Sequence, residues 1–179
     1  MPTRILTLGE KKILRFVFGE TLLYNTLRIT TNDANRGGAD NSITYTDIPH
    51  YSNQIWCADF SDRSADTWTF VHEFGHVWQY KYATPPINGW IENVMRHPVN
   101  YGLNYPYDLM KSDDFYDYNI EQQASIVADY WAVSVSYRAR YCRNPGSPKP
   151  SDYYNFISQV QSAGGTPLPA AGADPYRSI

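Results

Sequence analysis

The chain has 179 residues, a formal net charge of −3 and 18% charged residues, while 42% of its residues are hydrophobic. This length fits one domain, and so little charge excludes an intrinsically disordered chain or a coiled coil. The 15 lysines and arginines form no basic stripe, so we expect no nucleic-acid partner. We expect no membrane span, because no apolar run approaches about 18 residues. The first residues lack the apolar region of a secretory signal peptide.

The first third of the chain favours one helix followed by short strands. Residues 8–18 carry apolar side chains at helical spacing, and Gly19 follows where a helix typically ends. Three runs rich in β-branched and aromatic residues predict strands; they span residues 27–31, 43–46 and 54–60. The segments between these runs, including the one around Pro49, have the composition of loops.

Helices dominate the remainder of the chain. The sequence predicts them over residues 65–82, 87–96, 119–141 and 151–162. The aromatic, polar segment at 98–117 shows no period and is expected to be a long ordered loop. This order of elements predicts an α+β fold with one domain over residues 1–162 and a Gly/Pro-rich tail over 163–179. For Cys57 and Cys142 we expect two free thiols, with one disulfide as the alternative.

One segment, TFVHEFGHVWQY, carries the clearest chemical signal. On a helix, His72 and His76 lie about 40° apart and about 6 Å along the axis, so both imidazoles can bind a single Zn²⁺. Glu73 then lies beside the metal, where it can hold a water molecule instead of the ion. Gly75 is a poor helix former, which suggests that another backbone approaches closely there. A separate apolar stripe on this helix can face the core; it consists of Val71, Phe74 and Trp78.

A catalytic zinc usually has three protein ligands, and Glu121 is the best candidate for the third. It opens the helix predicted over 119–141, after a loop long enough to return to the histidines. Small side chains below it would let the two helices lie close together; they are Ala124, Ser125, Ala128 and Ala132. An acid that only favours the helix dipole is the alternative interpretation. Four acids of the preceding loop are fallback ligands: Asp108, Asp113, Asp114 and Asp117.

The sequence also resembles a known family. The segments HEFGHVWQY and YNIEQQASIVADYW, with the opening RILTLGEKKILRFVFG and the run TLRIT, are similar to zinc metallopeptidases described as Vgr-related or Rhs-associated proteins. These proteins are effectors linked to bacterial type VI secretion. The resemblance covers about residues 4–135. It implies a gluzincin-like fold of the zincin type, a zinc helix with the two histidines and Glu73, and a further element that begins at Glu121.

Two supporting roles have several candidates each. Many gluzincins carry an aspartate where this chain has Ser125, and that acid contacts the zinc ligands, so Asp59 and Asp129 are the candidates for orienting them here. The oxyanion formed during amide hydrolysis needs a hydrogen-bond donor opposite the metal, and Tyr107 or Tyr105 is the preferred candidate. Further candidate donors are Tyr116, which lies in the same predicted loop, and the imidazoles of His97 and His50.

These residues predict a zinc metallopeptidase, a hydrolase in which Zn²⁺ lowers the pKa of a water while Glu73 takes its proton. The substrate would be a protein or peptide, with the peptide stems of cell-wall peptidoglycan as an alternative. A zinc-braced protein that only binds a partner is the non-enzymatic alternative. The resemblance implies synthesis in the bacterial cytoplasm and delivery as a toxin into a target cell, with the periplasm as one destination. It also implies a secretion-spike component and an immunity protein as partners.

Overall fold

The computed structural model describes residues 3–32, 42–45, 47–62, 65–82, 105–144 and 146–163. Within these ranges the strands are β1 (Thr3–Ile5), β2 (Arg28–Asn32), β3 (Ile43–Tyr45) and β4 (Ile48–Ser52). The α-helices are α1 (Leu8–Phe18), α2 (Ala65–Tyr82), α4 (Ile120–Ser134) and α5 (Tyr154–Ser162). Short 3-10 helices are η1 (Phe60–Asp62), η3 (Phe115–Asp117) and η4 (Pro150–Tyr153). A small sheet with a mostly helical remainder confirms the predicted α+β class.

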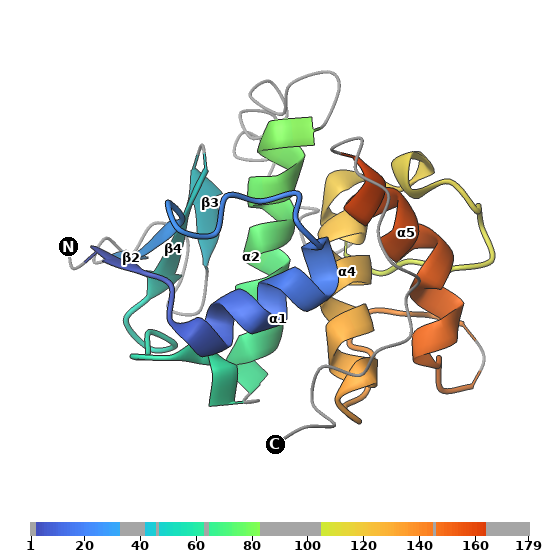
Figure 1. Cartoon of the computed structure of the whole chain (residues 1–179). Helices are drawn as coiled ribbons and strands as arrows, with labels where there is room; N and C mark the ends of the chain where they lie inside the picture. The colour runs from blue at the N-terminus through green and yellow to red at the C-terminus, as the bar shows by residue number, and fades with distance from the viewer. Residues whose placement is uncertain are drawn as a thin grey trace, which may run out of the picture.

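Helix α2 is the central element of the fold. The sheet has the order β1-β2-β4-β3, in which β2 and β4 are parallel and the other two pairs are antiparallel. Helix α2 contacts β3 and β4 as well as α4, and Figure 1 shows it between the sheet and α4. Its predicted core stripe is buried, as expected; the residues are Val71, Phe74 and Trp78. One face of α2 therefore supports the core while another remains available for chemistry.

Helix α1 is anchored to the sheet at its first turn. Thr7 and Glu10 form a capping box, in which the Thr7 hydroxyl accepts from Glu10 N and the Glu10 carboxylate accepts from Thr7 N. The buried Glu10 carboxylate also pairs with Arg4 at 2.6 Å and accepts from Phe60 N at 2.9 Å. One side chain thus joins α1, β1 and η1. The helix predicted over 8–18 is confirmed with the same bounds, as is the helix predicted over 65–82.

The strand predictions are partly wrong. The predicted strands at 27–31 and 43–46 correspond to β2 and β3, whereas the third strand is β4 and not residues 54–60. Pro49 lies opposite Thr44 in the antiparallel pairing with β3, and the parallel pairing with β2 begins one residue later, at His50. Proline is tolerated there because it lies next to the start of the β2 ladder. The run at 54–60 is apolar for another reason: side chains from it pack, partly buried, against the core from a turn; these are Ile55, Trp56 and Cys57. The short strand β1 was not predicted.

Helix α4 ends at Ser134, seven residues before the predicted end at 141. The chain leaves the helix because its next segment is held elsewhere. The buried Asp129 carboxylate accepts from Arg140 N at 2.6 Å and from Tyr141 N at 3.0 Å, and Tyr107 N donates to Tyr141 O at 3.2 Å. The helix predicted over 151–162 is present as η4 followed by α5. The predicted helix at 87–96, residues 98–104 of the predicted loop and residues 164–179 of the predicted tail lie outside the described residues.

Two expectations from the sequence concern the cysteines and the absence of a membrane span. Cys57 and Cys142 are free and partly buried. Burial raises the pKa of both thiols, that of Cys57 to about 11. Within the part of the chain that the structure describes, no helix has both the length and the apolar character needed to cross a membrane.

Gly75 marks a close contact between α2 and α4, as the sequence predicts. A Cβ atom added at Gly75 would lie 2.9 Å from Ala124 Cα and 3.0 Å from Ala124 Cβ, so the second backbone leaves no space for a side chain. The small residues predicted on α4 are buried in the structure; they are Ala124, Ser125, Ala128 and Ala132. This contact lies between the two helices that carry the candidate metal ligands.

We expect the substitution Gly75→Val to reduce the free energy of unfolding by about 1–3 kcal/mol, because the added side chain overpacks this contact. Urea unfolding measures the change. The control is Ser158→Val, which adds the same residue at an exposed position of α5 and should change stability by less than about 0.5 kcal/mol. Equal stability of the two variants would show that the helices separate at no cost.

Candidate metal centre

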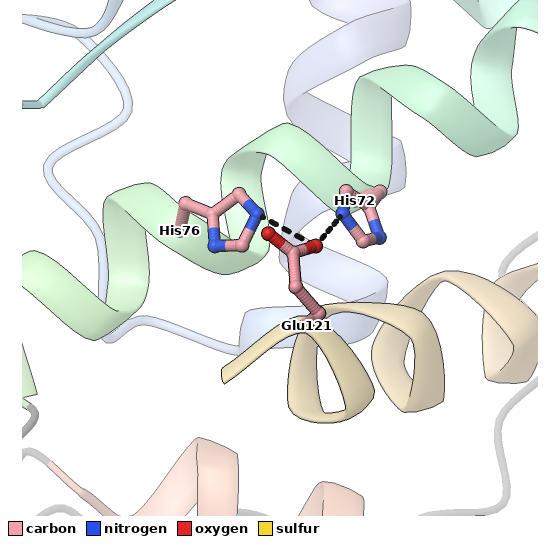
Figure 2. Close-up of side chains that lie close together, drawn as sticks. All are labelled: His72, His76 and Glu121. Carbon is pink, nitrogen blue, oxygen red and sulfur yellow. Dashed lines mark hydrogen bonds and ion pairs between the residues drawn. The ribbon is translucent and has the colours of Figure 1, made fainter. Parts of the chain in front are cut away.

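Three side chains from two helices converge between α2 and α4. His72 and His76 lie one turn apart on α2, and Glu121 lies in the first turn of α4. Figure 2 shows the Glu121 carboxylate between the two imidazole rings. The Nε2 atoms of His72 and His76 lie 3.0 Å and 3.5 Å from Glu121 Oε2, and none of the three side chains is more than 11% exposed. The structure thus brings together the three residues predicted as metal ligands.

A capping box fixes the turn that carries Glu121. Asn119 Oδ1 accepts from Gln122 N at 3.0 Å, and Gln122 Oε1 accepts from Asn119 N at 3.1 Å. Gln122 Nε2 also donates to Pro106 O at 2.8 Å, which ties this turn to the preceding loop. With the start of α4 held in this way and the helices in contact at Gly75, the Glu121 carboxylate reaches the imidazoles of α2.

The donor atoms fit zinc by type and by spacing. One donor atom from each of His72, His76 and Glu121 lies within 4.8 Å of the other two. Atoms bound to tetrahedral zinc at its usual bond lengths lie about 3.3–3.6 Å apart, which is close to the 3.0 Å and 3.5 Å separations at Glu121 Oε2. Among the described residues, no other group of three or more His, Cys, Asp or Glu side chains gathers in this way. Two imidazoles and one carboxylate can hold zinc and leave a fourth position open.

The charges of these groups are strongly coupled. Burial opposes ionisation of Glu121, but attraction to His76 and hydrogen bonds from both imidazoles outweigh it and lower the pKa of the carboxyl. Burial likewise opposes protonation of His76, but the same carboxylate raises the pKa of the imidazole to about 9. The centre therefore combines a carboxylate that stays ionised with a His76 imidazole whose protonated form this carboxylate stabilises.

Glu73 lies beside the ligands and is held by the edge strand β3. The Thr44 hydroxyl lies 2.7 Å from Glu73 Oε2 and 3.1 Å from Glu73 O, so it can donate to either atom. Burial raises the pKa of Glu73 despite the nearby His76, His72 and the Thr44 hydrogen bond. A buried carboxyl with a raised pKa, next to a metal site but outside the ligand cluster, is suited to accept and return a proton.

The side chain that contacts the far ring nitrogen of His76 is Gln79, which the sequence analysis did not identify. Gln79 Oε1 lies 2.8 Å from His76 Nδ1, and Gln79 Nε2 donates to Ile120 O at 2.8 Å and to Gln123 Oε1 at 3.0 Å. Its position is the one sequence signal that could have identified it, because Gln79 lies one turn after His76, on the face of α2 that carries both histidines.

Aromatic rings pack against the imidazole of His72, whose Nε2 contacts Glu121. Its imidazole stacks on Trp68, with centroids 5.0 Å apart, and packs against Tyr105 at 5.5 Å. Within the described residues, His72 Nδ1 is buried without a hydrogen-bond partner. Asp129, a candidate for orienting the ligands, acts one step away: its Oδ1 accepts from Trp68 Nε1 at 2.7 Å.

The prediction that Asp59 orients the zinc ligands is wrong. Its carboxylate accepts from the Thr7 hydroxyl at 3.0 Å and from Ser61 N at 2.8 Å, which places it at the start of α1. Ser125 Oγ, at the position where many gluzincins carry the orienting aspartate, is buried without a hydrogen-bond partner in the described part of the chain. The contact that orients a histidine ligand in the structure is thus the one from the Gln79 amide to His76.

The two tyrosines predicted as oxyanion donors occupy different places. The Tyr107 hydroxyl is buried and donates to Asp129 Oδ2 at 2.7 Å, so its proton is already used in the core. Tyr107 would have to give up this contact to act as the oxyanion donor, and that role stays a prediction. Tyr105 lies at the site, with its ring between those of His72 and Tyr141, at centroid distances of 5.5 Å and 5.1 Å. Tyr105 as the oxyanion donor stays a prediction.

Of the remaining candidates, those among the described residues do not join the ligand cluster. Tyr116 packs against Trp78, His50 lies in β4, and His97 lies outside the described residues. None of the four fallback acids belongs to the group formed with Glu121. Three of them accept local hydrogen bonds through their carboxylates instead; these are Asp108, Asp114 and Asp117.

Comparison with known proteins places this geometry in context. No protein-family profile matches the sequence. The chain is 30% identical over 133 residues to the type VI secretion system spike protein VgrG2b of Pseudomonas aeruginosa. The match covers 72% of this chain but spans only 13% of that much longer protein.

The fold is similar to a solved structure of part of the same protein. The effector domain of Pseudomonas aeruginosa VgrG2b superposes with a TM-score of 0.62 and 28% sequence identity. The superposition covers 74% of this chain and 75% of the solved one. The chain is thus similar in both sequence and fold to the effector domain of a type VI secretion spike protein.

Proposed function

We propose that the chain is a zinc-dependent metallopeptidase of the gluzincin type that acts as a type VI secretion effector. The observation that carries the proposal is the buried group of His72, His76 and Glu121, with Glu73 next to it on α2. The described residues supply three ligands, which leave one coordination position for chemistry, whereas a structural zinc site has four protein ligands. A role restricted to binding a partner is therefore the weaker candidate.

The residues of the centre would have two roles, metal binding and proton transfer. His72, His76 and Glu121 would hold the metal. Zinc bound there would polarise the substrate carbonyl and make water more acidic. Glu73 would take a proton from the attacking water and return it to the leaving nitrogen, and Thr44 would hold one oxygen of Glu73 during this transfer.

Delivery and partners follow from the similarity to a secretion spike. Because the related domain is part of a spike protein, we propose that this effector travels with a spike component into a target cell. A peptidase that harms bacteria would require an immunity protein in the producing cell. The proposed substrate is a protein or peptide, hydrolysed at an amide bond.

Metal removal is the direct test of this function. We expect a quenched fluorescent peptide library to be cleaved by the zinc-loaded protein, to lose cleavage with a chelator and to recover it when zinc is restored. Purified cell wall, incubated in parallel, tests the peptidoglycan alternative. Absence of cleavage of either substrate by fully zinc-loaded protein would contradict the proposal, and a fourth protein ligand on the zinc would favour the binding role.

A further inference from the structure

Two buried glutamines, Gln79 of α2 and Gln123 of α4, form a hydrogen-bonded amide pair next to the metal centre. We propose that this amide pair fixes which ring nitrogen of His76 faces the metal and thereby sets the affinity for zinc. The inference deepens the proposed function and rests on it. Gln79 is a positioning residue here, because it touches His76 and Ile120 but none of the reacting atoms.

The direction of each hydrogen bond in the pair is determined by backbone carbonyls. Gln123 Nε2 lies 2.8 Å from Tyr118 O, and Gln79 Nε2 lies 2.8 Å from Ile120 O. A carbonyl oxygen only accepts, so the nitrogen of each amide must face it. The oxygen of Gln79 is then directed at His76, where it lies 2.8 Å from Nδ1.

This arrangement leaves one solution for the imidazole. Since an amide oxygen cannot donate, His76 Nδ1 must carry the hydrogen of that contact. Nε2, the atom that lies 3.5 Å from Glu121 Oε2, is then the ring nitrogen that can give up its proton and bind a metal. His72 has no comparable partner, because its Nδ1 is buried without a hydrogen bond among the described residues.

The amide pair also joins the two helices that supply ligands. Through Ile120 O, Gln79 holds the residue that precedes Glu121, and through Gln123 it makes a second contact with the first turn of α4. Gln79 is 1% exposed and Gln123 is 6% exposed, so water is a poor substitute for a lost contact. A change at Gln79 therefore acts on His76 and on the backbone beside Glu121 together.

The test compares zinc affinity in three variants of the whole chain. Gln79→Leu keeps the size of the side chain and removes its hydrogen bonds, and we expect it to bind zinc about 10–100-fold more weakly. Gln123→Leu should have a smaller effect. The double variant should bind no more weakly than Gln79→Leu alone, because Gln123 acts on the site through Gln79. Affinity is measured by competition with a chelator, without any assay of activity.

The matched control is Gln159→Leu. Gln159 of α5 also uses both ends of its amide, accepting from Phe115 N at 2.9 Å and donating to Asp113 O at 2.7 Å, but it lies outside the metal centre. The Gln159→Leu substitution should lower the melting temperature of the metal-free protein and leave its zinc affinity unchanged. If Gln79→Leu does the same, or if the two glutamine effects simply add, the inference is wrong. If the wild type takes up no zinc, the proposed function fails as well.

Discussion

Glu73→Gln should leave zinc bound at wild-type affinity and reduce turnover by about 10²–10⁴-fold, the contribution typical of a general base. Glutamine has nearly the same shape and still accepts from Thr44, but its amide cannot take a proton from water. Elemental analysis measures the zinc content, and the peptide assay gives kcat and KM. We expect the loss to fall on kcat, because the proton transfer belongs to the transition state.

The control for this prediction is Glu20→Gln, the same substitution at a residue whose side chain is 65% exposed and pairs with Arg15. Its turnover should equal that of the wild type. Full activity in Glu73→Gln would mean that another group receives the proton. Loss of zinc in that variant would instead mean that Glu73 belongs to the ligand set.

The helices and the metal motif could be predicted because the relevant signals are local. Local start, stop and spacing signals predicted the bounds of α1 and α2, and a spacing of one turn put His72 and His76 on one face. Gly75 predicted a close backbone contact, which the structure places at Ala124. Glu121 could be proposed as a partner because small residues follow it on the same helix.

The parts that sequence could not supply depend on partners far apart in the chain. The end of α4 is set by hydrogen bonds from Arg140 N and Tyr141 N to Asp129, and no composition signal marks where those amides turn back. The hydrogen bond from the Tyr107 hydroxyl to that buried carboxylate could not be predicted for the same reason. A glutamine such as Gln79 has no distinctive pattern either, because its partners are backbone and amide groups of α4.

Glu121 offers the other large effect, on metal binding and not on proton transfer. Glu121→Ala should lower zinc affinity by more than about 100-fold, because loss of a ligand exceeds the 10–100-fold cost typical of losing a supporting contact. Glu121→Gln should also bind zinc weakly, since an amide oxygen brings no negative charge to the ion. In the metal-free protein, Glu121→Gln should lower the pKa of His76 from about 9, because the largest of the interactions that oppose the effect of burial is lost.

Chelator competition measures the affinity, and NMR titration of the imidazole signals in metal-free protein measures the pKa. The matched control is Asp117→Asn, an acid-to-amide change in the preceding loop, where the carboxylate accepts from the Ser112 hydroxyl at 2.6 Å. Zinc affinity should be unchanged in this control. Unchanged zinc content in Glu121→Ala would show that the third ligand is another residue. Loss of zinc in Asp117→Asn but not in Glu121→Ala would place that ligand in the loop before α4, which the convergence of both imidazoles on the Glu121 carboxylate argues against.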